Sequence, residues 1–431
     1  MIKRFFNTVN IYLIVSLILL TGAACTRHDL SLESLVLGIP GAELEKIQAD
    51  SMYASAYRIM IPQPLDHEHP EKGSFMQKIY VSQVDPDRPV VFITEGYAAN
   101  RNYPGELSRL LDANQIIVEH RFFGESVPDS LEWNYLTIEQ AASDHHRIVQ
   151  LFKKLYKGKW INTGISKGGQ TSMYHRYFFP DDVNISVPYV GPLNFSIDDP
   201  RIYTFLDTVG TPECRQRIHD FQELVLKKRD VLYPMFLSDC ELNNYTHTRL
   251  TPEEAYEYSV LEYSFAFWQW GYWECDDIPV ATSSNEEKFN HFKAVGGFSY
   301  FSDEGIKELE PFFYQAMTEI GYYGYDFSEF EGLLKYVNNS VFTFAAPQNV
   351  ALFYNDQIMM KVNTFLQNEA NHFIYIYGGS DTWSATSVDI GNNKNSLKIY
   401  KRNGDHRTRI NNLPEKQKEM VMITLENWLI N

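Results

Sequence analysis

Cysteine is scarce in this sequence, and it never has the spacing of a metal site. Only 4 cysteines occur among the 431 residues, and none belongs to a C-x-x-C pair. No histidine-rich tract accompanies them. The ligand pattern of a structural zinc site is therefore missing, and we expect no metal.

Positive charge is also in short supply. The chain has 38 lysine and arginine residues against 55 aspartate and glutamate residues, a formal net charge of −17. Nucleic acids and anionic lipids are polyanions, so this balance opposes nonspecific binding to either of them. We expect no nucleic-acid partner, and a cationic ligand or a free amine suits the chain better.

No apolar run near the N-terminus is long enough for a permanent membrane span. The run at 11–20 is half the length of about 20 residues that a spanning helix requires. With two basic residues before it and small residues after it, this run predicts a signal peptide over 1–24 and export to the bacterial cell envelope. The segment 21–25 also resembles a bacterial lipoprotein box, although Gly22 stands where a larger aliphatic residue is usual. Lipidation of Cys25, and with it membrane anchoring, is the favoured fate, and a secreted or periplasmic protein is the alternative.

Three cysteines remain if Cys25 carries a lipid, an odd number for an oxidising compartment. The simplest arrangement is one disulfide and one buried thiol among Cys214, Cys240 and Cys275. The sequence does not choose the pair.

Strand-like and helical segments alternate through two separate parts of the chain. Residues 25–50 show no strong pattern and are expected to tether the domain to the envelope. Residues 51–195 begin with two alternating strands, expected to form an antiparallel edge, and continue with short β-branched runs typical of buried parallel strands. Residues 196–339 are mostly helical and rich in aromatic rings, as an inserted cap would be. The alternation resumes over 340–431, which predicts an α/β fold built from both flanking parts.

The segment Lys159–Gly169 is the stretch around which the chemistry is organised. A β-favouring run leads into Gly164-Ile165-Ser166-Lys167-Gly168, and a helix-compatible segment follows. This is the strand, sharp turn and helix of a G-x-S-x-G nucleophile elbow, which holds a serine hydroxyl clear of a sheet. An ordinary glycine-rich loop is the alternative interpretation of these five residues alone.

A serine nucleophile needs a histidine base and an orienting carboxylate, which follow it in the order acid and then histidine in α/β-hydrolases. Asp381 and His406 each follow a predicted strand, at the end where open α/β sheets build their sites. We therefore predict Ser166 as nucleophile, Asp381 as acid and His406 as base. The weaker candidates for the acid are Asp405, which is expected to shape the histidine loop, and Asp198, Asp199 and Asp389.

Two backbone N–H groups are expected to form an oxyanion hole. Lys167 supplies the first, because it follows the nucleophile. The loop after the third predicted strand supplies the second, with Tyr97 as the donor. The Lys167 side chain is expected to pack or to form an ion pair, with no catalytic role.

The elbow is one of several motifs spread over nearly the whole chain after the signal segment. They are Gln63-Pro64-Leu65-Asp66-His67, Glu119-His120-Arg121-Phe122-Phe123-Gly124-Glu125-Ser126, Gly164-Ile165-Ser166-Lys167-Gly168-Gly169-Gln170-Thr171, Pro180-Asp181-Asp182-Val183, Val187-Pro188-Tyr189-Val190, Val209-Gly210-Thr211-Pro212-Glu213-Cys214-Arg215 and Gly404-Asp405-His406. Together they resemble the PS-10 serine peptidases, the bacterial secreted tripeptidyl aminopeptidase family.

A more distant resemblance joins residues 65–67 and 119–121 to lysosomal prolyl carboxypeptidase and dipeptidyl peptidase II. Those relatives carry tyrosines at the positions of Phe122, Phe123 and Lys167. This departure favours the bacterial family.

The resemblance implies the same triad and the release of tripeptides or dipeptides from the free N-termini of peptides. Such an exopeptidase must recognise an ammonium group, most simply through carboxylates at a blocked end of its pocket. The candidate substrate-binding residues are Glu95 near the oxyanion loop and, in the predicted cap, Glu262, Trp268, Trp270 and Glu274. The plainer interpretation is that cap acids face water and cap rings form a core.

The leading hypothesis is a serine exopeptidase on an α/β-hydrolase fold with a mostly helical inserted cap, acting through an acyl-enzyme without a cofactor. One alternative is a lipase or esterase on the same fold, because a triad does not itself select amides. The other is a noncatalytic envelope lipoprotein that binds peptides. The sequence leaves open the oligomeric state, the length of the released unit and the preference at the scissile bond.

Overall fold

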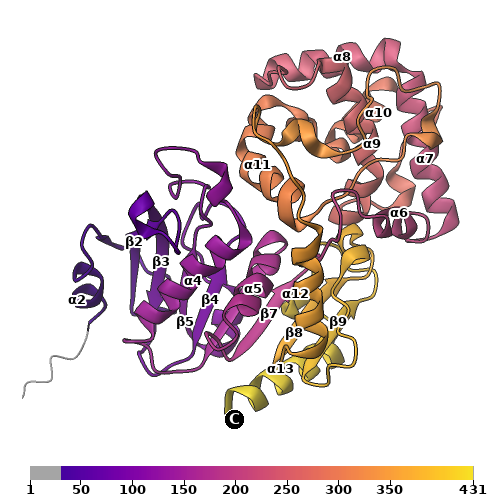
Figure 1. The fold of residues 1–431 in the computed structure, drawn as a ribbon. Helices are drawn as coiled ribbons and strands as arrows, with labels where there is room; N and C mark the ends of the chain where they lie inside the picture. Colours follow the sequence, from indigo (N-terminus) through magenta and orange to yellow (C-terminus); the bar gives the residue numbers. More distant parts are fainter. Residues whose placement is uncertain (1–30, 431) are drawn as a thin grey trace, which may run out of the picture.

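The computed structural model describes residues 31–430, drawn as a ribbon in Figure 1. The predicted signal peptide over 1–24 and the predicted lipidation site Cys25 lie outside these residues. Within the described residues the chain forms two parts, a sheet flanked by helices and a second part built mainly of helices (Figure 1).

The described residues of the first part contain a nine-stranded sheet in the order β1-β2-β3-β5-β4-β6-β7-β8-β9. Its strands are β1 (Glu43–Ile47), β2 (Ser55–Pro64), β3 (Ser74–Gln83), β4 (Val90–Thr94), β5 (Asn114–Val118), β6 (Trp160–Ile165), β7 (Ile185–Tyr189), β8 (Phe373–Gly378) and β9 (Ser396–Lys401). The pairs β1–β2, β2–β3 and β3–β5 are antiparallel, and all later pairs are parallel. The predicted antiparallel edge is confirmed.

Helices cover both faces of this sheet. They are α2 (Leu32–Leu37), α3 (Glu106–Leu111), α4 (Ile138–Phe152), α5 (Lys167–Phe178), α12 (Asp356–Asn368) and α13 (Glu415–Ile430), with short 3₁₀ turns η1 (Pro70–Lys72), η2 (Trp133–Tyr135), η8 (Thr382–Thr386) and η9 (Ile410–Asn412). Side chains alternate along β4, so Phe92 packs in one apolar cluster with α2 and α4, while Ile93 packs in another with α3 and α13. Both faces of the central strands are therefore buried, which explains their continuous apolar sequences.

The segment before Asp50 has regular structure that the sequence did not predict. Ser31 caps the N-terminus of helix α2, and its hydroxyl accepts a hydrogen bond from the Ser34 N–H at 3.1 Å. Strand β1 then pairs with β2 and becomes the outermost strand. The expectation of a patternless tether over 25–50 is therefore wrong for the residues in α2 and β1. A short edge strand is buried on one side only, so its apolar signal is weak.

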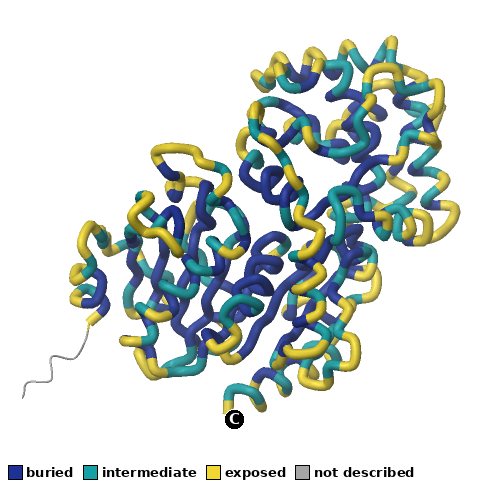
Figure 2. Tube along the Cα trace, in the orientation of Figure 1, coloured by how far each residue is buried: buried dark blue, intermediate teal, exposed yellow. Residues whose placement is uncertain are grey.

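The helical part lies between β7 and α12 in the chain. Its elements are α6 (Arg201–Leu206), α7 (Pro212–Lys227), α8 (Arg229–Asn243), α9 (Pro252–Trp270), η3 (Cys275–Asp277), α10 (Asn285–Gly296), η4 (Phe298–Phe301), α11 (Asp303–Gln315), the π-helical turn η5 (Ala316–Ile320), η6 (Ser328–Phe330) and η7 (Phe342–Ala345). Helix α9 starts with Thr251 and Glu254 in a reciprocal capping box and Pro252 in the first turn. Buried residues fill the interior of both parts (Figure 2).

A disulfide joins Cys214 in α7 to Cys275 in η3, and Cys240 is a buried free thiol. The expected arrangement of one disulfide and one buried thiol is confirmed. The bond fastens the turn that follows α9 to α7, which restricts the unfolded chain and so stabilises the helical part. Burial raises the pKa of Cys240 to about 11, so this thiol is a poor nucleophile.

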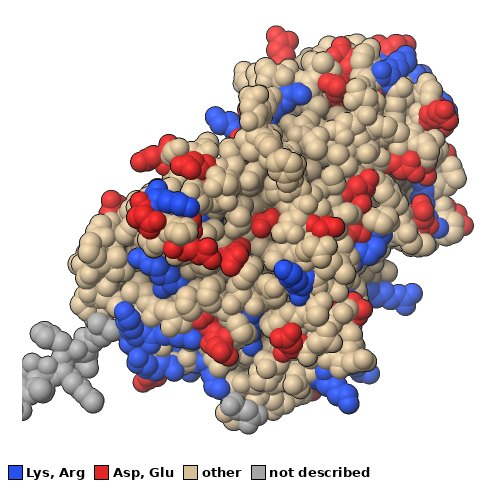
Figure 3. Space-filling model, in the orientation of Figure 1, with Lys and Arg blue, Asp and Glu red and all other residues tan. Residues whose placement is uncertain are grey.

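The parallel strands, the helices on both faces and the helical insertion after β7 make up the predicted α/β-hydrolase fold. Parallel strands end at the same edge of a sheet, and ligands bind at that edge in folds of this class. Acidic and basic side chains lie interspersed over the face of the molecule in Figure 3, on both parts of the structure.

A buried ion pair fastens the strands of the antiparallel edge to α4. Arg121, after β5, donates to both carboxylate oxygens of Asp144 in α4, at 2.7 Å each. It also donates to the carbonyl oxygens of Pro64 and Leu65 at 3.1 and 3.0 Å. Burial acts to raise the pKa of Asp144, but the Arg121 guanidinium outweighs it and holds that pKa below the ordinary value.

We expect Asp144→Asn to lower the free energy of unfolding by about 3–5 kcal/mol, because it leaves a buried guanidinium without its counter-charge. The matched control is Asp112→Asn, which removes the carboxylate from the exposed Arg88–Asp112 pair and should change stability by less than about 1 kcal/mol. Urea unfolding curves measure both. Equal effects of the two substitutions would contradict the structural role of the Arg121–Asp144 pair.

Candidate active site

Ser166 occupies a strained turn between β6 and α5. Its backbone has φ 56° and ψ −122°, a conformation that residues other than glycine seldom adopt. Two hydrogen bonds hold it there. The Ser166 N–H donates to the Tyr189 carbonyl at 2.9 Å, and the Ser166 carbonyl accepts from Gln170 at 3.0 Å. Strain of this kind persists where surrounding contacts enforce it, and it is typical of functional sites.

Close backbone packing enforces the turn. A Cβ atom on Gly164 would lie 2.2 Å from the Gly168 carbonyl oxygen, and one on Gly168 would lie 2.6 Å from the Thr94 carbonyl oxygen. The Thr94 hydroxyl also donates to the carbonyls of Thr163 and Gly168, at 3.1 and 3.0 Å. The end of β4 therefore fixes the position of Ser166, and no side chain fits between them.

His406 and Asp381 lie side by side on the loops after β9 and β8. His406 Nδ1 is 2.7 Å from Asp381 Oδ2, and both side chains are buried. The other Asp381 oxygen accepts from the Trp383 N–H at 3.2 Å. Burial raises the pKa of Asp381, and the neighbouring His406 acts in the opposite direction. The pair can orient an imidazole whose Nε2 is left to exchange a proton.

The other candidate acids have different partners. The Asp405 carboxylate accepts from the Arg407 N–H at 2.7 Å and pairs with its guanidinium, so it shapes the loop as expected. Asp199 pairs with Arg201 at 2.7 Å. Two further carboxylates accept hydrogen bonds from neutral groups: Asp198 from the Tyr203 hydroxyl and Asp389 from Gln367.

The helical part holds the His406 loop in place. The His406 N–H donates to the Gln269 carbonyl near the end of α9 at 2.8 Å. The Trp270 ring stands edge-on to the His406 ring, with centroids 5.7 Å apart. Arg409 donates to the His406 carbonyl at 3.1 Å. The histidine is therefore positioned jointly by the sheet and by α9.

The loop after β4 brings Tyr97 to the serine. The His120 N–H donates to the Tyr97 carbonyl at 3.1 Å, and the Ala99 N–H donates to the buried Glu119 carboxylate at 2.8 Å. Burial raises the pKa of Tyr97, and an interaction of its hydroxyl with the Ser166 side chain works against that rise. The Tyr97 side chain thus reaches the serine, which the sequence did not indicate.

The Lys167 side chain ties the Tyr97 loop to the elbow. Its ammonium nitrogen donates to the Gly96 carbonyl at 2.7 Å and lies 5.7 Å from the centre of the Tyr97 ring. Burial lowers the pKa of Lys167 well below its ordinary value. Since Lys167 is the first residue of α5, its backbone N–H precedes the hydrogen bonds of that helix and points toward the loop end of the sheet.

A cavity of about 630 Å³ opens above Ser166, between the strand ends and the helical part. Seven predicted site residues line it: Glu95, Tyr97, Ser166, Lys167, Glu262, Trp270 and His406. Asp381 is fully buried behind His406. The structure thus brings together residues that follow β4, β6, β8 and β9 in the core and residues of helix α9.

Two carboxylates in this cavity, the buried Glu262 and the half-buried Glu95, accept hydrogen bonds from tyrosine hydroxyls. Glu262 accepts from the hydroxyls of Tyr323 and Tyr325, at 2.8 and 2.6 Å. Burial raises its pKa to about 7, although both hydroxyls act to lower it. Glu95 accepts from the Tyr103 hydroxyl at 2.7 Å, and burial likewise raises its pKa. Neither carboxylate has a cationic partner among these contacts, so each can receive one from a ligand.

Two predicted substrate-binding residues do not line this cavity. Side chains four residues apart share a face of a helix, so Glu262 and Ala266 both face the active-site cavity. Trp268 is two residues beyond Ala266, so it points to another side of α9 and lines a different cavity. Glu274 is exposed and caps η3 in a reciprocal capping box with Asp277. Neither residue therefore contributes to the cavity above Ser166.

The cavity also contains residues that the sequence did not single out. They include Asn194, Gln269, Tyr322, Tyr323, Arg407 and Arg409. The two arginines follow His406 closely in the chain, and that adjacency is a signal that could have found them. Tyr322 and Tyr323 lie in an irregular segment after η5, where no periodic sequence pattern indicates which way a side chain points.

Among residues 31–430, no cluster of three or more histidine, cysteine or acidic side chains is placed to hold a metal ion. Over the same residues, no helix combines the length and apolar character needed to cross a bilayer.

Comparisons with known proteins give the following similarities. The sequence model of the family described as PS-10 peptidase S37 matches residues 27–429. A prolyl tri/tetrapeptidyl aminopeptidase from Streptomyces mobaraensis is 30% identical over 416 residues, covering 94% of this chain and 86% of the relative. Human lysosomal Pro-X carboxypeptidase is 27% identical over 140 residues, 28% of each chain. Among solved structures, a proline iminopeptidase from Mycobacterium smegmatis is similar with a TM-score of 0.40 at 11% identity, covering 86% of this chain and 99% of that one.

We expect Lys167→Met to slow labelling of Ser166 by a fluorophosphonate probe by about tenfold, less than the 100-fold to 1000-fold typical of deleting an oxyanion donor. The substitution keeps the apolar stem but removes the hydrogen bond to Gly96, so the Tyr97 loop loses its tie to the elbow. Lys361→Met, at an exposed position of α12, is the control. An unchanged labelling rate in Lys167→Met would show that the tie is dispensable.

Proposed function

Because the chain belongs to the PS-10 peptidase S37 family, and so is a serine exopeptidase, we propose that Ser166, His406 and Asp381 are its nucleophile, base and orienting acid. One observation carries this assignment. A strained serine shares a cavity with a histidine whose other ring nitrogen is 2.7 Å from a buried aspartate. No other carboxylate discussed above has a comparable contact with His406.

In the proposed mechanism, Ser166 Oγ attacks the scissile carbonyl carbon while His406 Nε2 accepts the hydroxyl proton. Asp381 holds the imidazole through Nδ1 and stabilises the imidazolium that forms. Collapse of the tetrahedral intermediate breaks the peptide bond, and His406 returns the proton to the leaving amine. Water then attacks the acyl-enzyme with His406 again as base, which releases the N-terminal fragment and restores Ser166.

The oxyanion of the intermediate is proposed to bind the backbone N–H groups of Lys167 and Tyr97. Preorganised donors of this kind stabilise charge where it develops. The tie from the Lys167 side chain to the Gly96 carbonyl supports the proposal, because it fixes the spacing of the two loops that carry these donors.

The substrates are peptides, and we propose that the enzyme recognises their free N-terminus and releases units of two or three residues. Glu262 is the proposed receptor for the ammonium group, with Glu95 as a second carboxylate. Glu262 is buried and Glu95 half-buried, and the hydrogen bonds that they accept come from tyrosine hydroxyls, so an ammonium would supply the missing charge. The Streptomyces relative is described as a tri/tetrapeptidyl aminopeptidase, which supports units of three residues over units of two.

The family membership removes the noncatalytic alternative, and no feature of the cavity specifically favours an ester substrate. We propose further that residues 196–339 form the cap of this site and that residues 1–24 are a cleaved signal peptide. Lipidation of Cys25 would then anchor the enzyme in the cell envelope. Mass spectrometry of the mature N-terminus tests both processing steps.

Ser166→Ala should reduce hydrolysis of a tripeptidyl chromogenic substrate by roughly 10⁴-fold to 10⁶-fold, because loss of the nucleophile removes the acyl-enzyme pathway. Ser238→Ala, at an exposed position of α8, is the control and should retain parental activity. A Ser166→Ala enzyme that keeps the parental rate would refute the assignment.

Glu262→Gln should lower kcat/KM for free-amine peptides by roughly 10-fold to 100-fold at pH 8, the range expected for one lost hydrogen bond to a charged group. The pKa of Glu262 is raised to about 7, so the carboxylate is neutral below that pH and gains its charge above it. The parental KM should therefore fall as the pH rises from about 6 to about 7.5, and this slope should disappear in the variant.

The matched control is Glu274→Gln, an exposed cap position outside the cavity. N-acetylation of the substrate provides a second comparison, because it removes the ammonium from the other side of the interaction. Acetylation should impair the parent strongly and Glu262→Gln little. Equal impairment of both would exclude Glu262 as the ammonium receptor.

A further inference from the structure

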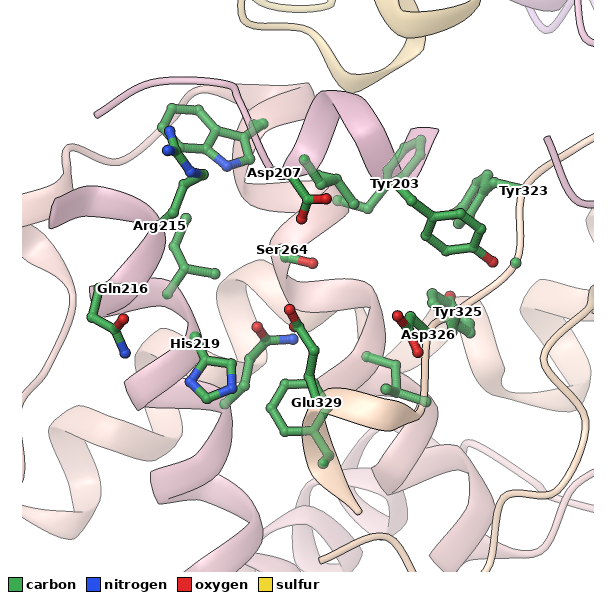
Figure 4. A pocket seen from close by; sticks show the side chains of 18 of the residues that line it. Tyr203, Asp207, Arg215, Gln216, His219, Ser264, Tyr323, Tyr325, Asp326 and Glu329 are labelled. Atoms are coloured by element: carbon green, nitrogen blue, oxygen red, sulfur yellow. The ribbon is translucent and has the colours of Figure 1, made fainter. Parts of the chain in front are cut away.

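A second cavity lies within the helical part, next to the active-site cavity. It has a volume of about 520 Å³ and is bordered by α7, α9 and the segment 323–330. Figure 4 shows Tyr323, Tyr325 and Asp326 on one side of it and Arg215, Gln216 and His219 on the other. The mechanism above does not use this space.

One wall separates the two cavities. Tyr323 lines both of them. Its ring stacks on the Phe265 ring of α9, with centroids 4.0 Å apart and planes 12° apart, and both side chains are buried. Along α9, Leu261, Phe265 and Trp268 line the second cavity, whereas Glu262, Ala266 and Gln269 line the active-site cavity.

The proposed ammonium receptor sits in this wall. Glu262 faces the active-site cavity, but the Tyr325 hydroxyl that binds it comes from a residue lining the second cavity. A peptide whose N-terminus reaches Glu262 therefore ends against Tyr323, and the Phe265 ring lies behind that tyrosine. Any further residue at its N-terminus would have to occupy the position of these rings.

We propose that the Phe265–Tyr323 ring pair limits the length of the N-terminal fragment that the enzyme accepts, and that the second cavity is an extension of the same binding site from which this pair separates it. The proposal rests on the proposed function, because it assigns an end point to the fragment that Ser166 releases. Tyr323 and Phe265 are specificity-determining residues in this account, with no contact to the reacting atoms.

The second cavity is suited to receive a longer fragment. Its lining includes the carboxylates of Asp207, Asp326 and Glu329, which could meet an N-terminal ammonium displaced beyond Glu262. Its volume nearly doubles the space available when added to that of the active-site cavity. Removal of the wall would thus supply both room and charge complementarity.

The test compares kcat/KM for chromogenic peptides with two to six residues before the scissile bond. In Tyr323→Ala, the ratio of the five-residue to the three-residue substrate should rise at least about tenfold over the parent, the scale on which one pocket wall discriminates. Tyr323→Phe keeps the ring and loses only the hydroxyl bond to Glu262. It should leave the ratio unchanged.

A second substitution closes the opened space. Ser264 lines the second cavity, so Ser264→Trp should fill it. In the parent background it should not alter the length preference, and in Tyr323→Ala it should restore the preference for short fragments. Phe265→Leu opens the wall from the α9 side and should act in the same direction as Tyr323→Ala if that variant folds poorly.

The outcomes separate the two proposals. If the parent enzyme releases no short N-terminal fragments, the proposed function is refuted, and so is the proposal that the Phe265–Tyr323 pair limits fragment length. If the parent releases them, and Tyr323→Ala or Phe265→Leu is labelled by fluorophosphonate yet keeps the parental length preference, the wall alone is refuted. Relaxed preference that Ser264→Trp does not reverse would also refute the second cavity as the extension.

Discussion

The architecture of the site depends on one constraint, the absence of space between the end of β4 and the turn that carries Ser166. The backbones of Gly164, Gly168 and Thr94 touch where a Cβ atom would collide. The serine can take its left-handed conformation only because these contacts and the hydrogen bond to the Tyr189 carbonyl enforce it. The Tyr97 loop starts from the same end of β4, so this strand end positions both the proposed nucleophile and the proposed oxyanion donors.

A second layer of buried charge supports this arrangement. The Glu119-His120-Arg121 motif touches the Tyr97 loop on one side and Asp144 on the other. Glu119 accepts from Ala99 in the loop, and its partner Lys78 comes from β3 at 2.8 Å. The charged residues of this motif are therefore paired within the fold and do not enter the reaction. Their role is to hold the Tyr97 loop in place.

The sequence predicted the parts of the site that depend on local pattern. Ser166, Asp381 and His406 follow recognisable strands, and parallel strands must end at one edge, so their convergence could be expected before any coordinates. The other site residues could not be predicted from local pattern, because their role depends on the direction in which each side chain points. Trp268 and Trp270 are two residues apart on α9, yet only Trp270 faces His406. Tyr323 follows a π-helical turn, and nothing in the adjacent sequence shows that its ring lies between two cavities. Strand β1 was missed because an edge strand of five residues is too short and too polar to display its period.

The insertion of the helical part between β7 and β8 also orders events during synthesis. Ser166 leaves the ribosome early, while Asp381 and His406 follow only after the whole helical part. His406 is in addition held by the Gln269 carbonyl of α9, so its loop cannot settle until that helix exists. A nascent or truncated chain that ends before Phe373 therefore carries the serine without either partner. For a serine peptidase, this chain order means that an incomplete copy lacks both the proposed base and the proposed acid.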